Sequence, residues 1–268
     1  METRLGRPEL LALDFDGVLC NGLREYFQTA WRAYAQIWSP GESEPPAGLA
    51  DRFYRLRPVI ETGWEMPVLL RSLLSGTDDA AILTDWLGVS QSLVAREQLD
   101  PVTLARAVDG ARDAWLERDV EGWLALHDFF PGAIEFLEQL ERDRLPWVIV
   151  TTKESRFVRQ LLADCGLDLC GDRLFGKDVG RPKFETLEKL VAERGVASDR
   201  LWFVEDRLPA LLAASARPKL AGIKLFLAEW GYTTDEQRHQ ARESDFVELL
   251  SLPAFVGGVE RWHEVGVS

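Results

Sequence analysis

Three short apolar runs, each ending on polar side chains, constrain the fold of this chain more than any other feature. They cover residues 10–13, 147–150 and 201–204, and a segment with helical periodicity follows each of them. Apolar runs of this length without polar alternation are typical of strands buried on both faces. Strands that alternate with helices predict a parallel sheet covered by helices on both of its faces.

The second half of the chain completes this alternation. Phe130-Pro131-Gly132 breaks the chain just before a helical pattern begins. We expect a further strand at 222–227 and helices at 133–142, 154–165, 184–194, 207–216 and 235–250.

A long stretch without a convincing strand separates the first apolar run from the rest of the sheet. Residues 21–128 carry several helical patterns, and Phe27, Trp31 and Tyr34 fall on one helical face, which indicates core packing. The sequence therefore predicts an α/β protein with two parts. Residues 1–20 and 129–268 form a parallel sheet core, and residues 21–128 form an inserted α-helical cap domain.

Composition narrows the choice of partners and compartment. The 268 residues carry a net charge of −13, which argues against nucleic acid and against an anionic membrane as partners. The three cysteines, Cys20, Cys165 and Cys170, cannot pair completely, so we expect buried thiols in a reducing compartment. No run approaches a membrane span or a signal peptide, and we expect a cytoplasmic protein that is a monomer or a homodimer.

The polar residues at the strand ends predict a single site. Asp14 and Asp16, Thr151, and Glu205-Asp206 follow the three apolar runs. Ligands of open α/β sheets bind beyond the carboxyl ends of the strands, so these side chains should converge. Converging carboxylates repel one another unless a hard cation such as Mg²⁺ binds them, and a phosphate ester then suits the site as substrate.

These residues also resemble a known family. Asp14-Phe15-Asp16-Gly17-Val18, Thr151, Lys183 and Glu205-Asp206 are similar, in order and position, to the four motifs of the haloacid dehalogenase-like (HAD) superfamily. The resemblance covers the whole chain and implies a Rossmann-like core with an all-helical cap inserted after the first motif.

The resemblance implies a role for each matching residue. Asp14 would attack phosphorus and form an aspartyl-phosphate, and Asp16 would act as general acid and then general base. The Asp14 carboxylate, the Asp16 backbone carbonyl and Asp206 would hold Mg²⁺, with Glu205 nearby or bridging through water. Thr151 and local backbone N–H groups would bind the phosphate oxygens.

The third motif leaves two candidates for its cation, Arg181 and Lys183. We favour Lys183, because an ammonium fits a compact gap between carboxylate and phosphate better than a planar guanidinium. Arg181 and Thr152 remain candidates for substrate binding. Arg57, in the cap, could clamp a second anionic group of the substrate, or it could form ion pairs within the cap.

Taken singly, each motif also has a plain structural interpretation. The Asp14 turn could be an ordinary loop, Thr151 could cap the next helix, and Glu205-Asp206 could begin a helix. Lys183 could be a solvated surface residue. Only the occurrence of all four motifs together predicts a catalytic site.

Asp16 separates the expected activities. Halide leaves without a proton, whereas an alcohol leaving group needs an acid, so Asp16 favours phosphate chemistry. We expect an Mg²⁺-dependent phosphatase that acts on a small phosphorylated metabolite. The alternatives are a sugar phosphomutase on the same scaffold and a non-catalytic metabolite-binding or assembly protein, since a fold alone does not establish chemistry.

Overall fold

The structure, a computed structural model, describes residues 6–39, 41, 43–169 and 171–262. It divides the chain into two compact units: a sheet unit, Met1–Asn21 with Asp128–Ser268, and a helical unit, Gly22–His127. Cys170, which we expected to be a buried thiol, lies outside the described residues.

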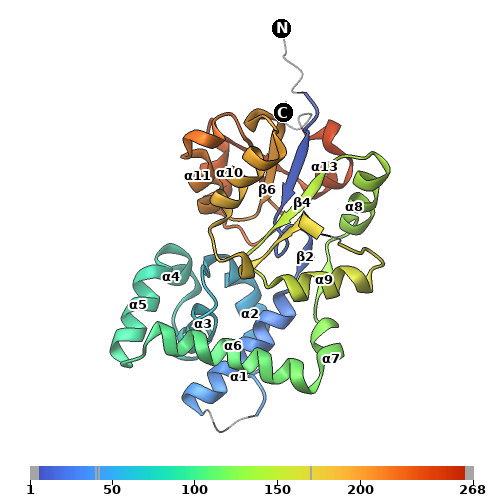
Figure 1. Cartoon of the computed structure of the whole chain (residues 1–268). Helices are drawn as coiled ribbons and strands as arrows, with labels where there is room; N and C mark the ends of the chain where they lie inside the picture. Colours follow the sequence, from blue (N-terminus) through green and yellow to red (C-terminus); the bar gives the residue numbers. More distant parts are fainter. Residues whose placement is uncertain (1–5, 40, 42, 170, 263–268) are drawn as a thin grey trace. The chain divides into compact units, whose positions relative to one another are not determined.

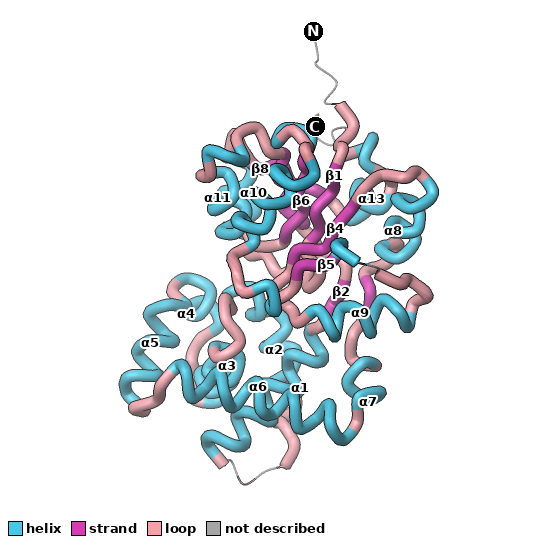
Figure 2. Tube along the Cα trace, viewed as in Figure 1, coloured by secondary structure: helices cyan, strands magenta, loops and turns pink. Residues whose placement is uncertain are grey.

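The sheet unit contains a parallel six-stranded sheet in the order β5-β4-β1-β6-β7-β8, drawn in magenta in Figure 2. This arrangement confirms the predicted α/β fold class. The strands are β1 (Leu10–Leu13), β4 (Trp147–Val150), β5 (Leu174–Phe175), β6 (Leu201–Glu205), β7 (Lys224–Ala228) and β8 (Val247–Leu250).

Helices connect these strands. They are α8 (Ala133–Arg142), α9 (Ser155–Asp164), α10 (Lys183–Arg194), α11 (Leu208–Ser215), α12 (Asp235–Arg242) and α13 (Leu252–Val256). Short 3₁₀ turns add η2 (Gly171–Arg173), η3 (Lys177–Val179), η4 (Ser198–Arg200), η5 (Pro218–Leu220) and η6 (Val259–Arg261).

Alternate residues of the central strands pack into two separate layers. Leu10 and Phe203 join a core that includes Leu187 of α10 and Leu211 of α11. The preceding residue of β6, Trp202, packs against Phe226 and Trp262 instead, with tilted rings and centroids 5.2 and 5.6 Å away. Figure 1 shows α10 and α11 on one side of the sheet and α8 and α13 on the other. Both faces are therefore buried, which explains the unbroken apolar runs.

The structure differs from the sequence prediction at several places in this unit. Residues 235–250 are not one helix, because α12 ends at Arg242 and Val247–Leu250 forms the edge strand β8. The two-residue strand β5 and the short helix α13 were not predicted. Cys165, expected to be a buried thiol, is exposed at the end of α9, whereas Cys20 is buried.

The helical unit contains only helices and loops in its described residues. The helices are α1 (Leu23–Trp38), α2 (Leu49–Leu56), α3 (Glu65–Leu74), α4 (Asp79–Thr84), α5 (Trp86–Arg96), α6 (Pro101–Arg118) and α7 (Val120–Leu124), with the 3₁₀ turn η1 (Arg57–Val59). The aromatic face of α1 is buried as core, and Trp31 and Tyr34 stack with their centroids 5.2 Å apart.

Aspartates begin four successive helices of this unit. Asp78, Asp85, Asp100 and Asp119 each accept a hydrogen bond from a backbone N–H in the first turn of α4, α5, α6 or α7. Such caps satisfy N–H groups that the helix itself leaves unpaired. A share of the negative charge of the chain thus serves helix capping.

The two chain segments at the boundary pair with each other. Strand β2 (Cys20–Asn21) runs antiparallel to β3 (Asp128–Phe129), with Cys20 opposite Phe129 and Asn21 opposite Asp128.

Among the described residues, none of the helices has both the length and the apolar character that a membrane crossing requires.

Candidate active site

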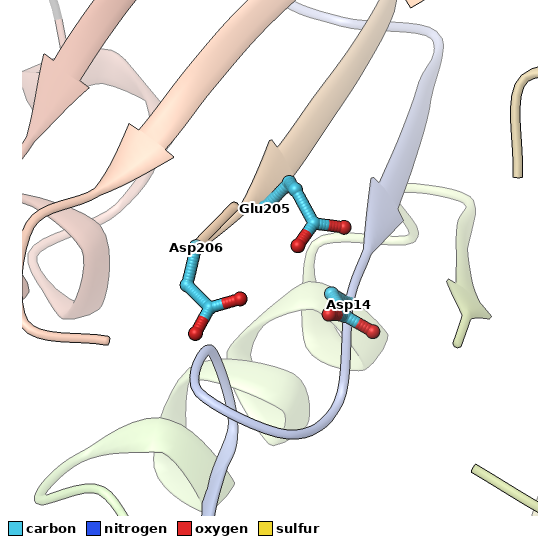
Figure 3. Close-up of side chains that lie close together, drawn as sticks. All are labelled: Asp14, Glu205 and Asp206. Carbon is cyan, nitrogen blue, oxygen red and sulfur yellow. The ribbon is translucent and has the colours of Figure 1, made fainter. Parts of the chain in front are cut away.

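Three carboxylates meet at the carboxyl ends of the neighbouring strands β1 and β6. Asp14 follows β1, Glu205 ends β6, and Asp206 comes next (Figure 3). One carboxylate oxygen from each lies within 4.8 Å of the others, and all three residues are at least 95% buried (5%, 0% and 1% exposed). The parallel pairing of β1 with β6 brings together residues that are almost 200 positions apart in sequence.

A tight turn after Asp14 makes room for Asp206. Gly17 has a φ of +86°, and a Cβ at this position would come within 1.9 Å of the Asp206 carboxylate. Gly231 approaches from another loop, where a Cβ would lie 2.3 Å from the Asp206 Cβ. Only glycine fits both positions, so the backbone itself shapes the space around this carboxylate.

Two hydrogen bonds, each between a backbone group and a side chain, hold the loop that brings Gly231 to the site. The N–H of Tyr232 donates to Asp206 Oδ2 at 2.7 Å, and the Trp230 indole N–H donates to the carbonyl of Val18 at 3.1 Å. The sequence analysis missed this segment, because a backbone N–H leaves no residue signature. The glycine of Trp230-Gly231-Tyr232 is the one signal it offers.

Lys183 supplies a buried positive charge to the cluster. Its ammonium lies 2.7 Å from Asp14 Oδ2 and 2.6 Å from Glu205 Oε2. Lys183 is the first residue of α10, directly after Pro182. Arg181, the alternative cation, turns away, and its Nε donates to Thr186 Oγ1 at 3.2 Å. In the structure, Lys183 rather than Arg181 contacts Asp14.

The protonation equilibria reflect this crowding. Burial raises the pKa of Asp14 to about 7, the charge of Glu205 adds to the rise, and Lys183 opposes it. Burial also raises the pKa values of Glu205 and Asp206 above their ordinary range. Burial alone would lower the pKa of Lys183, but Asp14 and Glu205 hold it above its usual value. The cluster is therefore short of positive charge.

The arrangement fits a divalent cation. Asp14 Oδ1 is buried and has no hydrogen-bond partner among the described residues, which is costly for a carboxylate oxygen. Both oxygens of Glu205 are engaged, by Lys183 and by the Arg207 N–H at 3.1 Å. Asp14 and Asp206 are thus the residues best able to hold a cation, and an all-oxygen set of ligands suits Mg²⁺.

Thr151 and Thr152 stand beyond the end of β4, the other neighbour of β1. They line a pocket of about 180 Å³ together with Lys183 and Arg181. Thr151 does not cap the following helix, because α9 has Glu154 at its N-cap position and no side-chain cap. Glu205 and Asp206 do not begin a helix either, since α11 starts at Leu208.

Asp16 does not join the other carboxylates. Its Oδ1 instead lies 3.1 Å from the ammonium of Lys153, two residues after Thr151. Lys153 was not among the predicted site residues. The signal was a lysine directly after two threonines at a strand end.

Arg57 lies in the helical unit, where it contacts its own neighbours. Its Nη1 donates to the carbonyl of Ile60 at 3.1 Å, and its guanidinium carbon lies 4.9 Å from the centroid of the Tyr26 ring. Glu65 fixes the next turn by accepting a hydrogen bond from the Thr62 N–H at 3.0 Å. The segment that carries Arg57 is therefore held by contacts within its own unit.

Known proteins share this architecture. A family model described as haloacid dehalogenase-like hydrolase matches residues 8–216. Phosphoglycolate phosphatase 1 of Pseudomonas aeruginosa is 26% identical over 233 residues, which cover 86% of this chain and 72% of that protein.

Solved structures are similar in fold. A protein described as a predicted phosphoglycolate phosphatase from Haemophilus somnus superposes with a TM-score of 0.58 at 17% identity, covering 91% of this chain and 95% of its own. A HAD family hydrolase from Deinococcus radiodurans, solved with bound phosphate and sodium, gives 0.52 at 16% identity, covering 91% of each chain. At these identities the likeness concerns the fold.

The protein is thus an α/β protein whose parallel sheet gathers three carboxylates and a lysine at its carboxyl edge, with a helical unit inserted in the chain after β2. Since the family model matches most of its length, the chain belongs to the haloacid dehalogenase-like hydrolase family.

Proposed function

We propose that this enzyme is a phosphatase that hydrolyses a small phosphorylated metabolite through an aspartyl-phosphate on Asp14. The observation that carries the proposal is the position of Asp14 beside Lys183 in a buried cluster of three carboxylates, where no described residue forms a hydrogen bond to Asp14 Oδ1. The phosphoglycolate phosphatases among the similar proteins support phosphate esters as the substrate class.

In the first step, a carboxylate oxygen of Asp14 attacks phosphorus, and the bond from phosphorus to the ester oxygen breaks. Asp16 gives its proton to the departing alkoxide, so that a neutral alcohol leaves. Lys183 stays 2.7 Å from Asp14 and offsets negative charge on the nucleophile and on the phosphoryl group.

In the second step, Asp16 takes a proton from water as the water oxygen attacks the aspartyl-phosphate. Inorganic phosphate leaves and the Asp14 carboxylate is restored. Thr151 and Thr152, at the end of β4, are proposed to bind the phosphate oxygens. Glu205 holds Lys183 in place through its 2.6 Å contact.

Mg²⁺, held by Asp14, Asp206 and the backbone carbonyl of Asp16, would neutralise phosphate charge when bound. The helical unit is proposed to act as the cap that excludes water and selects the ester, with Arg57 as a candidate contact for a second anionic group.

Phosphate release tests the proposal. Purified enzyme would be assayed with Mg²⁺ or with EDTA on a panel that includes 2-phosphoglycolate, simple alkyl phosphates and p-nitrophenyl phosphate. We expect Mg²⁺-dependent release that falls at least about 10³-fold in Asp14→Asn, since the nucleophile is lost.

Asp199→Asn is the matched control. It makes the same chemical change at an exposed residue next to the opposite end of β6, and it should leave activity intact. Equal hydrolysis by wild type and Asp14→Asn would disprove the nucleophile assignment. An isomeric product without free phosphate would instead select a phosphomutase, and binding without turnover would select a non-catalytic protein.

A further inference from the structure

Lys153 brings an additional ammonium to the acidic turn. Its side chain is only 8% exposed, and its Nζ lies 3.1 Å from Oδ1 of Asp16, whose side chain is 15% exposed. The two residues are separated by 137 positions and come from the loops after β4 and β1. An ion pair with so little solvent contact is more strongly coupled than a surface pair.

The backbone at Lys153 is fixed from both sides. Its N–H donates to Thr151 Oγ1 at 3.2 Å, and its carbonyl accepts from the N–H of Lys177 at 2.9 Å. Gly176 allows this approach, because a Cβ there would lie 2.6 Å from the Lys153 carbonyl oxygen. The Lys153 side chain therefore extends from a backbone that is hydrogen-bonded at both its N–H and its carbonyl.

Two lysines thus contact different acidic residues of the site. Lys183 contacts Asp14 and Glu205, whereas Lys153 contacts Asp16. An aspartate on a turn has two rotatable side-chain bonds, and a charge-assisted hydrogen bond selects one orientation. Proton transfer is sensitive to such orientation, since an error of about 1 Å can cost about 10²-fold in rate.

We propose that Lys153 is a positioning residue that orients Asp16 for proton transfer to the leaving group and from water. This inference rests on the proposed function, in which Asp16 is the general acid and base. Lys153 itself gives up no proton in either step. The proton passes from Asp16 to the ester oxygen as the bond to phosphorus breaks, and Asp16 later regains a proton from water.

The leaving group provides the test. An alkyl phosphate needs a proton on its departing oxygen, whereas p-nitrophenolate leaves readily without one. The quantity to measure is kcat/KM, because it reports the step in which the leaving group departs. Lys153→Met should lower kcat/KM for an alkyl phosphate by about 10- to 100-fold, and for p-nitrophenyl phosphate by less than about threefold.

A second substitution shows whether Lys153 acts through Asp16. In an Asp16→Asn background, adding Lys153→Met should change kcat/KM for the alkyl ester less than about twofold, because two residues that act together are not additive. Lys153→Arg keeps the charge but alters its geometry, so its kcat/KM for the alkyl ester should lie between wild type and Lys153→Met.

Lys189→Met is the control for loss of one lysine charge. Lys189 lies on α10, half-exposed, and pairs with Glu193 one helical turn away. Its substitution should leave both substrates unaffected. Thermal melts identify any variant that fails to fold, in which case Lys153→Arg carries the same comparison of the two esters.

Two results would overturn the inference while the proposed function stands. One is an equal loss of kcat/KM for the alkyl and the aryl ester, and the other is a full Lys153→Met effect in the Asp16→Asn background. If wild type releases phosphate from neither ester, the proposed function and this inference fail together.

Discussion

Each unit of this enzyme buries carboxylates, but the two units compensate them in opposite ways. In the helical unit, Glu25 is fully buried and accepts hydrogen bonds from Thr29 Oγ1 at 2.6 Å, Arg112 Nε at 2.8 Å and Trp123 Nε1 at 3.1 Å. One carboxylate there has one cation and polar partners. A buried carboxylate with a purely structural role needs a cation and hydrogen-bond donors of this kind, because burying its charge without them is costly.

The sheet unit compensates its buried negative charge only in part. Asp14, Glu205 and Asp206 share the ammonium of Lys183, and Asp14 Oδ1 has no hydrogen-bond partner among the described residues. The comparison teaches that burial alone does not mark a functional carboxylate. A functional carboxylate is indicated by too little positive charge and too few hydrogen bonds around it, and a bound ligand can supply both.

The largest effect on stability is expected in the helical unit. Glu25→Leu removes one partner and leaves Arg112 in a buried position, so it should lower the free energy of unfolding by about 3–5 kcal/mol. Urea denaturation followed by tryptophan fluorescence measures this loss. Asp14→Asn, which removes charge from the crowded cluster, should not lower stability. A similar decrease in the free energy of unfolding for both substitutions would contradict the difference between the two units.

Metal binding should produce an intermediate effect, confined to the sheet unit. A cation that binds only the folded protein at a free concentration of 100 times its Kd adds about 2.7 kcal/mol. Mg²⁺ should therefore raise the melting temperature of wild type and of Asp199→Asn, but not of Asp206→Asn. The same rise in Asp206→Asn would show that Mg²⁺ binds elsewhere.

The smallest effect concerns a partly exposed ion pair of the helical unit. Hydrogen bonds from Arg52 and Arg55 lower the pKa of Asp79 below its ordinary value. A carboxylate with a lowered pKa stabilises the folded state above its unfolded pKa of about 3.9, and this contribution is lost as the pH falls through the folded value.

Wild type should therefore exceed Asp79→Asn in stability at neutral pH, and the difference should shrink as the solution is acidified below about pH 4. Urea midpoints of both proteins, measured side by side at neutral and acidic pH, give the difference directly. A difference that grows on acidification would contradict this assignment.

The central sheet was predictable because its strands are buried on both faces. Strands β1 and β4 match the predicted runs 10–13 and 147–150, and β6 extends its run by Glu205. The edge strand β8 was not predicted, because Val247–Leu250 is short and includes an exposed glutamate. At an edge, neighbours rather than composition decide between helix and strand.

The site was predictable to the extent that topology alone determines it. Parallel strands carry their ends to one edge, so the convergence of Asp14 with Glu205 and Asp206 follows from the fold class. Side-chain direction does not follow from it. Lys183 was favoured from its place in the third motif, whereas the contact of Lys153 with Asp16 depends on the conformations of two loops and was not predicted.

Identification of the phosphorylated residue tests the central claim most directly. Wild type would be mixed with a radiolabelled phosphate ester and Mg²⁺, quenched in acid within the first turnover, digested and mapped. The account predicts label on the peptide that contains Asp14 and none in Asp14→Asn. Hydrolysis that proceeds without labelled protein, or with label on another residue, would contradict it.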